Sequence, residues 1–293
     1  MTTAATRRLR SAQPGSSSPV DHPAPVSRGG SIFSIVLAVM SVTALALVWR
    51  TYQQIWALEN GLDSHDPNFN KYWLSLAAAN IILLPSAAAV WYAWMWTSAR
   101  RIPKEMTRKE EGRRLWNLWL LVAVFTAAVF FGGSYAAEQD ASWHQIVTRD
   151  TAFTPSHDVL FYGAFPLMIY LSAGVYLYGR TRLPHIYGGK RLPVSFAMIV
   201  GGSLLLVFQV AMNEFGHSFF QAEEVFAAPL HWPFVFFAYL LAATFAIWFE
   251  TLPRIFELAR QERELSSIQA AESPNEPAVA TMTEPGGTTV GHR

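Results

Sequence analysis

The sequence predicts an all-α, polytopic membrane protein, a bundle of about six transmembrane helices. Hydrophobic residues make up 52% of the 293 residues and charged residues only 15%, too few charges to cover a water-soluble domain of this length. The 11 tryptophans lie mostly near the ends of apolar runs, the depth that amphipathic rings favour in a bilayer. Six such runs, each near the roughly 20 residues that a helix needs to cross a bilayer, cover about 31–49, 72–98, 115–136, 157–178, 194–213 and 232–252.

Polar segments flank the apolar region and divide the chain into three parts. Residues 1–30, rich in Ser, Pro, Ala and Arg, have too little apolar surface to pack, so we expect a disordered N-terminal tail. Residues 31–258 form the six-helix transmembrane domain. Residues 259–293 are expected to form a mostly disordered C-terminal tail, with little structure from about Glu262 onward.

The first run could instead be a signal peptide, because arginines precede it and the sequence ALA at 44–46 resembles a cleavage site. A spanning helix is the favoured interpretation, since the run is long for a signal peptide and ends in Trp49-Arg50, a typical membrane-edge pair. Two later runs contain Pro85 and Pro166. We expect neither proline to split its helix, because neighbouring helices can satisfy the freed carbonyls.

Basic residues are distributed unequally between the two sides of the bundle. The N-terminal tail, the second and fourth connections and the C-terminal tail carry 19 of the 22 Lys and Arg residues. The first and third connections carry only Arg50, Lys71 and Arg149, and the fifth carries none. Because cytoplasmic connections are enriched in Lys and Arg, we expect both termini in the cytoplasm and the first, third and fifth connections outside.

The two outer connections at 137–159 and 213–232 each carry a polar cluster of the same form. In the first, Asp140 and His144 are four residues apart, so on a continuing helix they share one face, and His157 begins the next apolar run. In the second, Asn213 and His217 are four apart and His231 begins the run that follows. Both clusters thus combine an i, i+4 pair from one helix with a histidine from its neighbour, an arrangement by which bundles converge metal ligands.

The residue types limit which metal these clusters could hold. The chain has no cysteine, so neither disulfides nor thiolate ligands are possible. Imidazole with carboxylate or amide suits copper, zinc or iron, and three ligands leave coordination positions open for a reactant. A single histidine at a membrane edge more often hydrogen-bonds a backbone carbonyl or a lipid headgroup. The repetition of one pattern in two connections favours metal sites.

The stretches EQDASWHQIVTRDTAFTPSH and NEFGHSFFQAEEVFAAPLHW resemble the C subunit of the copper-dependent membrane monooxygenases, the family of particulate methane, ammonia and short-chain hydrocarbon monooxygenases. The resemblance covers residues 32–258 and includes GLDSHDPNFNKYW after the first run. It implies one metal site at Asp140, His144 and His157 and a second at Asn213, His217 and His231, with copper as the metal.

The resemblance also implies partners, a location and an activity. The chain would act with separate A and B subunits, in a trimer of three-subunit protomers in the lipid of the bacterial inner membrane. The complex would hydroxylate methane, a short-chain alkane or ammonia with O₂. Nucleic acid is excluded as a partner, because the net charge is only +1 and the basic residues lie in short connections.

The two clusters differ in the total charge of their ligands. Asp140 gives the first set one negative charge, which suits Cu(II) or Zn(II), so zinc is an alternative metal there. The second set, with Asn213, is neutral and should favour Cu(I), the state that reacts with O₂. We therefore expect catalysis at Asn213, His217 and His231. A membrane metal or ion transporter and a non-catalytic structural subunit are the alternative functions. Against a transporter, both clusters lie at the outer edge and no chain of ionisable residues continues through the middle of the apolar runs.

Overall fold

The described part of the chain is entirely helical. The structure, a computed structural model, describes residues 28–102, 106–136, 139–140, 153–183, 186–187, 191–220 and 232–272, and it describes no side chain in 28–31, 133–134, 207 or 209–238. These residues form helices and short turns without a β-strand. The predicted all-α class is therefore confirmed.

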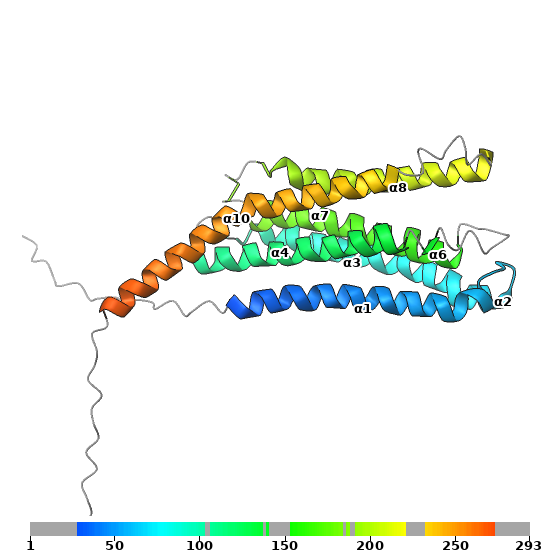
Figure 1. Cartoon of the computed structure of the whole chain (residues 1–293), viewed down its shortest axis with the longest axis horizontal. Helices are drawn as coiled ribbons and strands as arrows, with labels where there is room; N and C mark the ends of the chain where they lie inside the picture. Colours follow the sequence, from blue (N-terminus) through cyan, green and yellow to red (C-terminus); the bar gives the residue numbers. More distant parts are fainter. Residues whose placement is uncertain are drawn as a thin grey trace, which may run out of the picture.

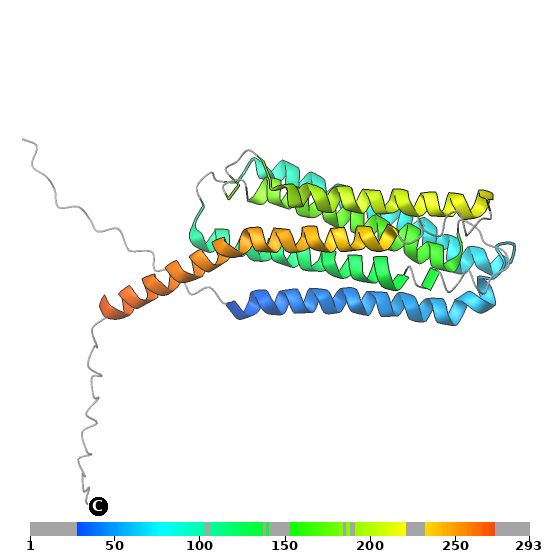
Figure 2. The same ribbon diagram turned by 45° about the horizontal axis from the view of Figure 1, so that its top comes forward.

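Six helical columns run side by side, one for each predicted apolar run (Figures 1 and 2). The first column is α1 (Arg28–Asn60) and the last two are α8 (Val194–Phe220) and α10 (Trp232–Glu272). The other three columns each combine α-helix with a π-helical segment. They are α2 (Pro67–Phe69), η1 (Asn70–Leu74) and α3 (Ser75–Ala99); α4 (Arg108–Val129) and η2 (Phe130–Ala136); and α6 (Pro155–Val159), η3 (Leu160–Ala164) and α7 (Phe165–Arg182).

Most of the columns have the length and composition of membrane spans. Four described helices qualify, Ile32–Asn60, Pro67–Ala99, Arg108–Gly132 and Pro155–Arg182, and α8 contributes the shorter apolar segment Val194–Leu206. Polar side chains concentrate at the ends of these helices, as expected where lipid surrounds their middle sections. The chain is an all-α, polytopic membrane protein.

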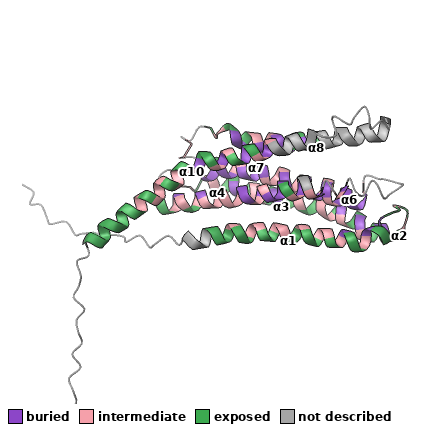
Figure 3. Ribbon diagram, viewed as in Figure 1, coloured by how far each residue is buried: buried purple, intermediate pink, exposed green. Residues whose placement is uncertain are grey.

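The α4 and α7 helices form the centre of the bundle, and α1 lies at its edge. The core includes the fully buried Phe125 of α4 and Met168 of α7, together with residues from α3, α8 and α10. The apolar window of α1 contains no buried residue, and large apolar side chains such as Val48 remain exposed on it. Figure 3 shows this contrast between the buried centre and the exposed α1. The exposed apolar face of α1 is suited to contact lipid.

All three π-helical segments lie toward the same end of the bundle. The η2 segment ends the third column and η3 follows the start of the fourth; the two segments are in contact, and η1 contacts α6 beside them. A Cβ added to Gly132 of η2 would come within 3.0 Å of the Ala164 Cβ in η3, so glycine allows the two backbones to approach closely. A Cβ on Gly163 would likewise meet the Trp49 ring of α1 at 3.0 Å. Small residues thus bring α1, η2 and η3 together at this end.

The prolines and the C-terminal segment test two expectations. Pro85 lies inside the continuous helix α3, and Pro166 occupies the first turn of α7, so neither proline splits a helix, as predicted.

The prediction for the start of the C-terminal tail was wrong, because α10 continues from the bundle to Glu272. Pairs four residues apart, such as Arg260 with Glu264 at 3.6 Å, support this exposed extension. Residues 1–27 and 273–293 lie outside the described residues.

Two contacts fasten α10 to α4 at the end of the bundle opposite the π-helical segments. The Trp119 indole donates a hydrogen bond to Thr251 Oγ1 at 2.8 Å. Arg254, one residue after the internal Pro253, donates two hydrogen bonds to the carboxylate of the buried Glu111, at 2.6 and 2.9 Å. Together with a bond to Glu257, they raise the pKa of Arg254 above its ordinary value. The Arg254–Glu111 ion pair holds α10 against α4 at the point where α10 leaves the bundle (Figure 2).

We expect Glu111→Gln to destabilise the protein by about 1–3 kcal/mol. The substitution removes the negative charge that pairs with Arg254, and the buried amide can accept only one of the two hydrogen bonds that Arg254 donates to the carboxylate. The upper values of that range are lowered by the partial exposure of Arg254. Thermal unfolding of the purified protein in lipid nanodiscs measures the effect. Glu264→Gln on the same helix is the control, since its pair with Arg260 is exposed, and an equal loss in both variants would contradict the assignment.

Candidate metal centre

Asp140 and His157 come together at the π-helical end of the bundle, as the sequence predicts for two ligands of one site. The Asp140 Oδ1 atom lies 3.4 Å from His157 Nε2. Both residues are buried, with 8% and 4% of their surface exposed. Ser156 Oγ donates a hydrogen bond of 2.6 Å to the same carboxylate oxygen. A carboxylate, an imidazole and a hydroxyl therefore share a pocket almost closed to solvent.

The start of the fourth column positions His157. Thr154 precedes the helix with extended backbone angles, and Pro155 occupies its first turn, where the missing N–H costs nothing. His157 is in the first turn, and its ring lies against Phe161, with centroids 4.7 Å apart and planes inclined by 54°. The ring is thus held between an apolar neighbour on one side and the Asp140 carboxylate on another.

The spacing of these two donor atoms fits metal ligation. For bonds of about 2.0–2.1 Å at a tetrahedral angle, two donor atoms on one metal lie roughly 3.3–3.4 Å apart. The 3.4 Å between Asp140 Oδ1 and His157 Nε2 is consistent with that value. One hard oxygen and one imidazole nitrogen form a donor set that copper and zinc both accept. No metal-binding group of three or more His, Asp or Glu is complete within the described part of the chain.

The other predicted ligands are described only in part or not at all. His144 and His231 lie outside the described residues. Asn213 and His217 belong to α8, so the predicted spacing of four residues within one helix is confirmed for the backbone, while their side chains are not described. The α8 and α10 helices pack against each other, which places the end of α8 and the start of α10 on neighbouring columns.

Sequence reasoning missed two residues beside His157. Ser156 has no signal of its own, since a serine before a helical histidine reads as an ordinary first-turn residue, and only the fold shows its contact with Asp140. Asp158 is fully buried, and neither of its carboxylate oxygens has a hydrogen-bond partner among the described residues. The adjacency of Asp158 to a candidate ligand was the only available signal.

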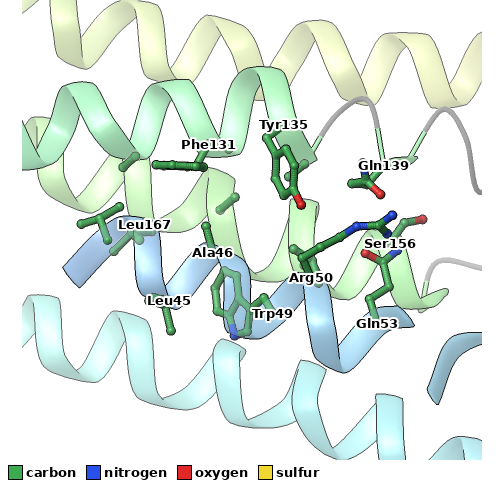
Figure 4. A pocket seen from close by; sticks show the side chains of 16 residues that line it. Leu45, Ala46, Trp49, Arg50, Gln53, Phe131, Tyr135, Gln139, Ser156 and Leu167 are labelled. Carbon is green, nitrogen blue, oxygen red and sulfur yellow. The ribbon is translucent and has the colours of Figure 1, made fainter. Parts of the chain in front are cut away.

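A cavity adjoins this cluster, between α1, η2 and the start of the fourth column. Figure 4 shows the polar residues Arg50, Gln53, Gln139 and Ser156 at one end of it. The opposite end is apolar and is formed by Leu45, Phe131 and Leu167. Ser156 belongs both to the cavity wall and to the Asp140 cluster, so the polar end of the cavity reaches the candidate site.

A model of a known family matches most of the chain. The family model AmoC, described as the C subunit of ammonia monooxygenase/methane monooxygenase, matches residues 31–262. The matched region contains the helical bundle, the Asp140 and His157 pair and α8. No curated protein matched the chain. Since the match spans most of the 293 residues, the chain belongs to the family formed by the C subunits of the ammonia and methane monooxygenases.

Proposed function

We propose that this chain is the C subunit of a copper-dependent membrane monooxygenase that hydroxylates methane, a short-chain alkane or ammonia with O₂. The proposal rests on membership of the C-subunit family over residues 31–262. Among this chain's own residues, the supporting observation is that Asp140 Oδ1 lies 3.4 Å from His157 Nε2 in a buried site. Together the two groups offer a metal ion one oxygen donor and one nitrogen donor.

In this proposal Asp140, His144 and His157 hold one metal ion, and Asn213, His217 and His231 hold another. Copper would supply one-electron chemistry with O₂. Zinc is the alternative at the first site, since its carboxylate suits a dication. The protein's own contribution there is orientation: Ser156 fixes the Asp140 carboxylate by a 2.6 Å hydrogen bond, and Phe161 supports the His157 ring.

We assign substrate hydroxylation to the second site. Asn213 is a neutral ligand, so it leaves more positive charge on the metal than Asp140 does and favours Cu(I). Aromatic residues close to His217 in the sequence FGHSFF would keep bulk water away. Asp140 makes the first site a firmer anchor, better suited to structure or storage.

The chain would act in a complex with separate A and B subunits, arranged as a trimer of three-subunit protomers. We place it in the bacterial inner membrane with both termini in the cytoplasm and both metal sites on the outer side. The fold supports this topology, because the start of α1 and the C-terminal part of α10 lie toward one end of the bundle (Figure 1), whereas Asp140 and His157 lie toward the other.

Ser156→Ala is expected to weaken metal binding at the first site about 10- to 100-fold, because it removes the hydrogen bond that orients Asp140. Competitive titration of the purified complex with Cu(II) and a chelator measures the change. Ser172→Ala is the control, since this buried serine donates to the Ile169 carbonyl in the same column. Equal affinities in both variants would show that Ser156 does not support the site.

His217→Ala should abolish hydroxylation while the complex remains assembled, because it removes a ligand from the proposed reactive site. His144→Ala should first lower copper content and assembly, because it opens the anchoring site. Subunit stoichiometry, copper content and product formation of the purified variants distinguish the two results. Intact turnover in His217→Ala, with turnover lost from a fully assembled His144→Ala complex, would mean that the roles of the two sites are reversed.

A reporter fused after Arg263 should read cytoplasmic, and one inserted between His217 and His231 should read external, because 19 of the 22 basic residues lie on the predicted inner side. Paired phosphatase and fluorescent-protein fusions provide the measurement. The opposite result at either position would move both metal sites to the cytoplasmic side and contradict the proposed topology.

A further inference from the structure

We propose that Arg182, at the end of α7 opposite the π-helical segments, binds the phosphate of an anionic phospholipid whose acyl chain lies along the outer face of α3. This lipid site is separate from both metal clusters, and it does not depend on the proposed function. Three observations support it: the incomplete pairing of a buried arginine, the positive charge around that arginine, and an exposed apolar stripe that leads to it.

Arg182 is held between the ends of two helices. It is the last residue of α7, and only 8% of its surface is exposed. Its Nη2 atom donates a hydrogen bond of 2.6 Å to Ser98 Oγ of α3, and its guanidinium group lies over the Trp94 ring, 4.7 Å from the centroid. A basic residue at a helix C-terminus complements the helix dipole. The dipole does not explain why this guanidinium group packs against a neighbouring helix.

The guanidinium group of Arg182 retains unused hydrogen-bond donors. A guanidinium carries about five N–H groups in a planar fork, and within the described part of the chain the only bond from this fork goes to Ser98. No ion pair between described residues includes Arg182. Its nitrogen atoms are also absent from the enclosed, unpartnered polar atoms of the described residues, so the remaining N–H groups reach the surface. Such a fork can bind phosphate through two N–H groups at once.

The arginines beside Arg182 favour a negatively charged ligand. Arg114 Nη1 donates a hydrogen bond of 2.9 Å to the Arg182 carbonyl oxygen, so a second guanidinium group lies at the same helix end. Arg113 and Arg114 share the single carboxylate of Glu110. These three arginines and one glutamate carry two more positive than negative charges. A bound phosphate would reduce this excess where the surrounding dielectric constant is low and the attraction between charges is strong.

An apolar stripe on α3 leads to this charged group and favours a lipid over a free anion. The exposed residues Leu83, Val90 and Trp94 form the stripe, and their spacings of seven and four residues place them on one side of the helix. At about 1.5 Å per residue the stripe is about 16 Å long, roughly half of the 30 Å hydrocarbon core. It therefore matches the acyl region of one leaflet, with Trp94 and Arg182 at the level of the headgroup.

The test measures lipid binding to the purified complex after its lipids have been removed in detergent. Native mass spectrometry gives the affinity for phosphatidylglycerol and for phosphatidylcholine with the same acyl chains. A phosphatidylglycerol with a photoreactive acyl chain, followed by peptide mapping, identifies the helix that the chain contacts. Arg182→Gln removes the guanidinium group, and Arg180→Gln is the matched control, because it removes the same charge from an exposed position two residues earlier. Trp94→Leu removes the ring beside Arg182 and keeps an apolar side chain on the exposed face.

Arg182→Gln should weaken phosphatidylglycerol binding about tenfold or more, because it removes charge-assisted hydrogen bonds to the phosphate. Trp94→Leu should weaken binding by a smaller factor, and Arg180→Gln should leave it unchanged. Photolabelling of the α3 segment from Leu83 to Trp94 should fall in the same order. The wild-type complex should bind phosphatidylglycerol more tightly than phosphatidylcholine, and inorganic phosphate should not displace it, because the acyl chain contributes to binding.

Equal affinities in Arg182→Gln and Arg180→Gln would overturn the proposal, and so would equal affinities of the wild type for the two lipids. Displacement by inorganic phosphate would indicate a free-anion site and overturn the lipid assignment. Loss of another subunit from Arg182→Gln, with no photolabelling of α3 in the wild type, would mean that Arg182 pairs with a carboxylate of that subunit instead. If Arg182→Gln does not assemble, Trp94→Leu decides: unchanged lipid affinity and photolabelling in that variant would overturn the proposal.

Discussion

Lipid offers no hydrogen-bond partners, and this constraint governs the rest of the structure. Every backbone N–H and C=O within the bilayer must be satisfied by the chain itself, so each apolar run becomes a continuous helix. Polar chemistry is confined to the ends of the columns, where water or other side chains can serve as partners. The end that holds Asp140 and His157 is also the end that holds η1, η2 and η3. Departures from α-helical geometry thus accompany the candidate functional groups.

A buried carboxylate near a membrane edge is costly unless it has partners. Asp140 has such partners, among them the Ser156 hydroxyl and the His157 imidazole, and both of these come from one turn of helix. The close approach of Gly132 to Ala164 allows this turn to lie against η2. Gly132 and Ala164 also line the adjoining cavity, so the polar cluster and the apolar space beside it depend on the same close approach of η2 and η3.

The sequence predicted the features that depend on composition and failed on those that depend on packing. Six apolar runs became six columns, because length and hydropathy decide whether a segment spans a membrane. The approach of Asp140 to His157 followed from their positions at the ends of adjacent runs and from the family resemblance. The role of Ser156 and the burial of Asp158 could not be predicted, because both depend on which column lies opposite. The extension of α10 to Glu272 was missed because a polar, Ser-containing segment reads as a tail, although its i, i+4 pairs stabilise a helix.

The π-helical segments give this end of the bundle a property that regular helices lack. A π turn accommodates one residue more than an α turn, so the residues beyond it are rotated by about 100° relative to an uninterrupted α-helix. In the third column η2 lies between the core helix α4 and Asp140, and in the fourth column η3 lies between His157 and α7. In the fourth column the angular position of His157 relative to α7 therefore depends on a single residue in η3. Insertions and deletions of one residue, which would ruin the register of a buried strand, become here a means of re-aiming a ligand while the membrane-embedded core keeps its packing.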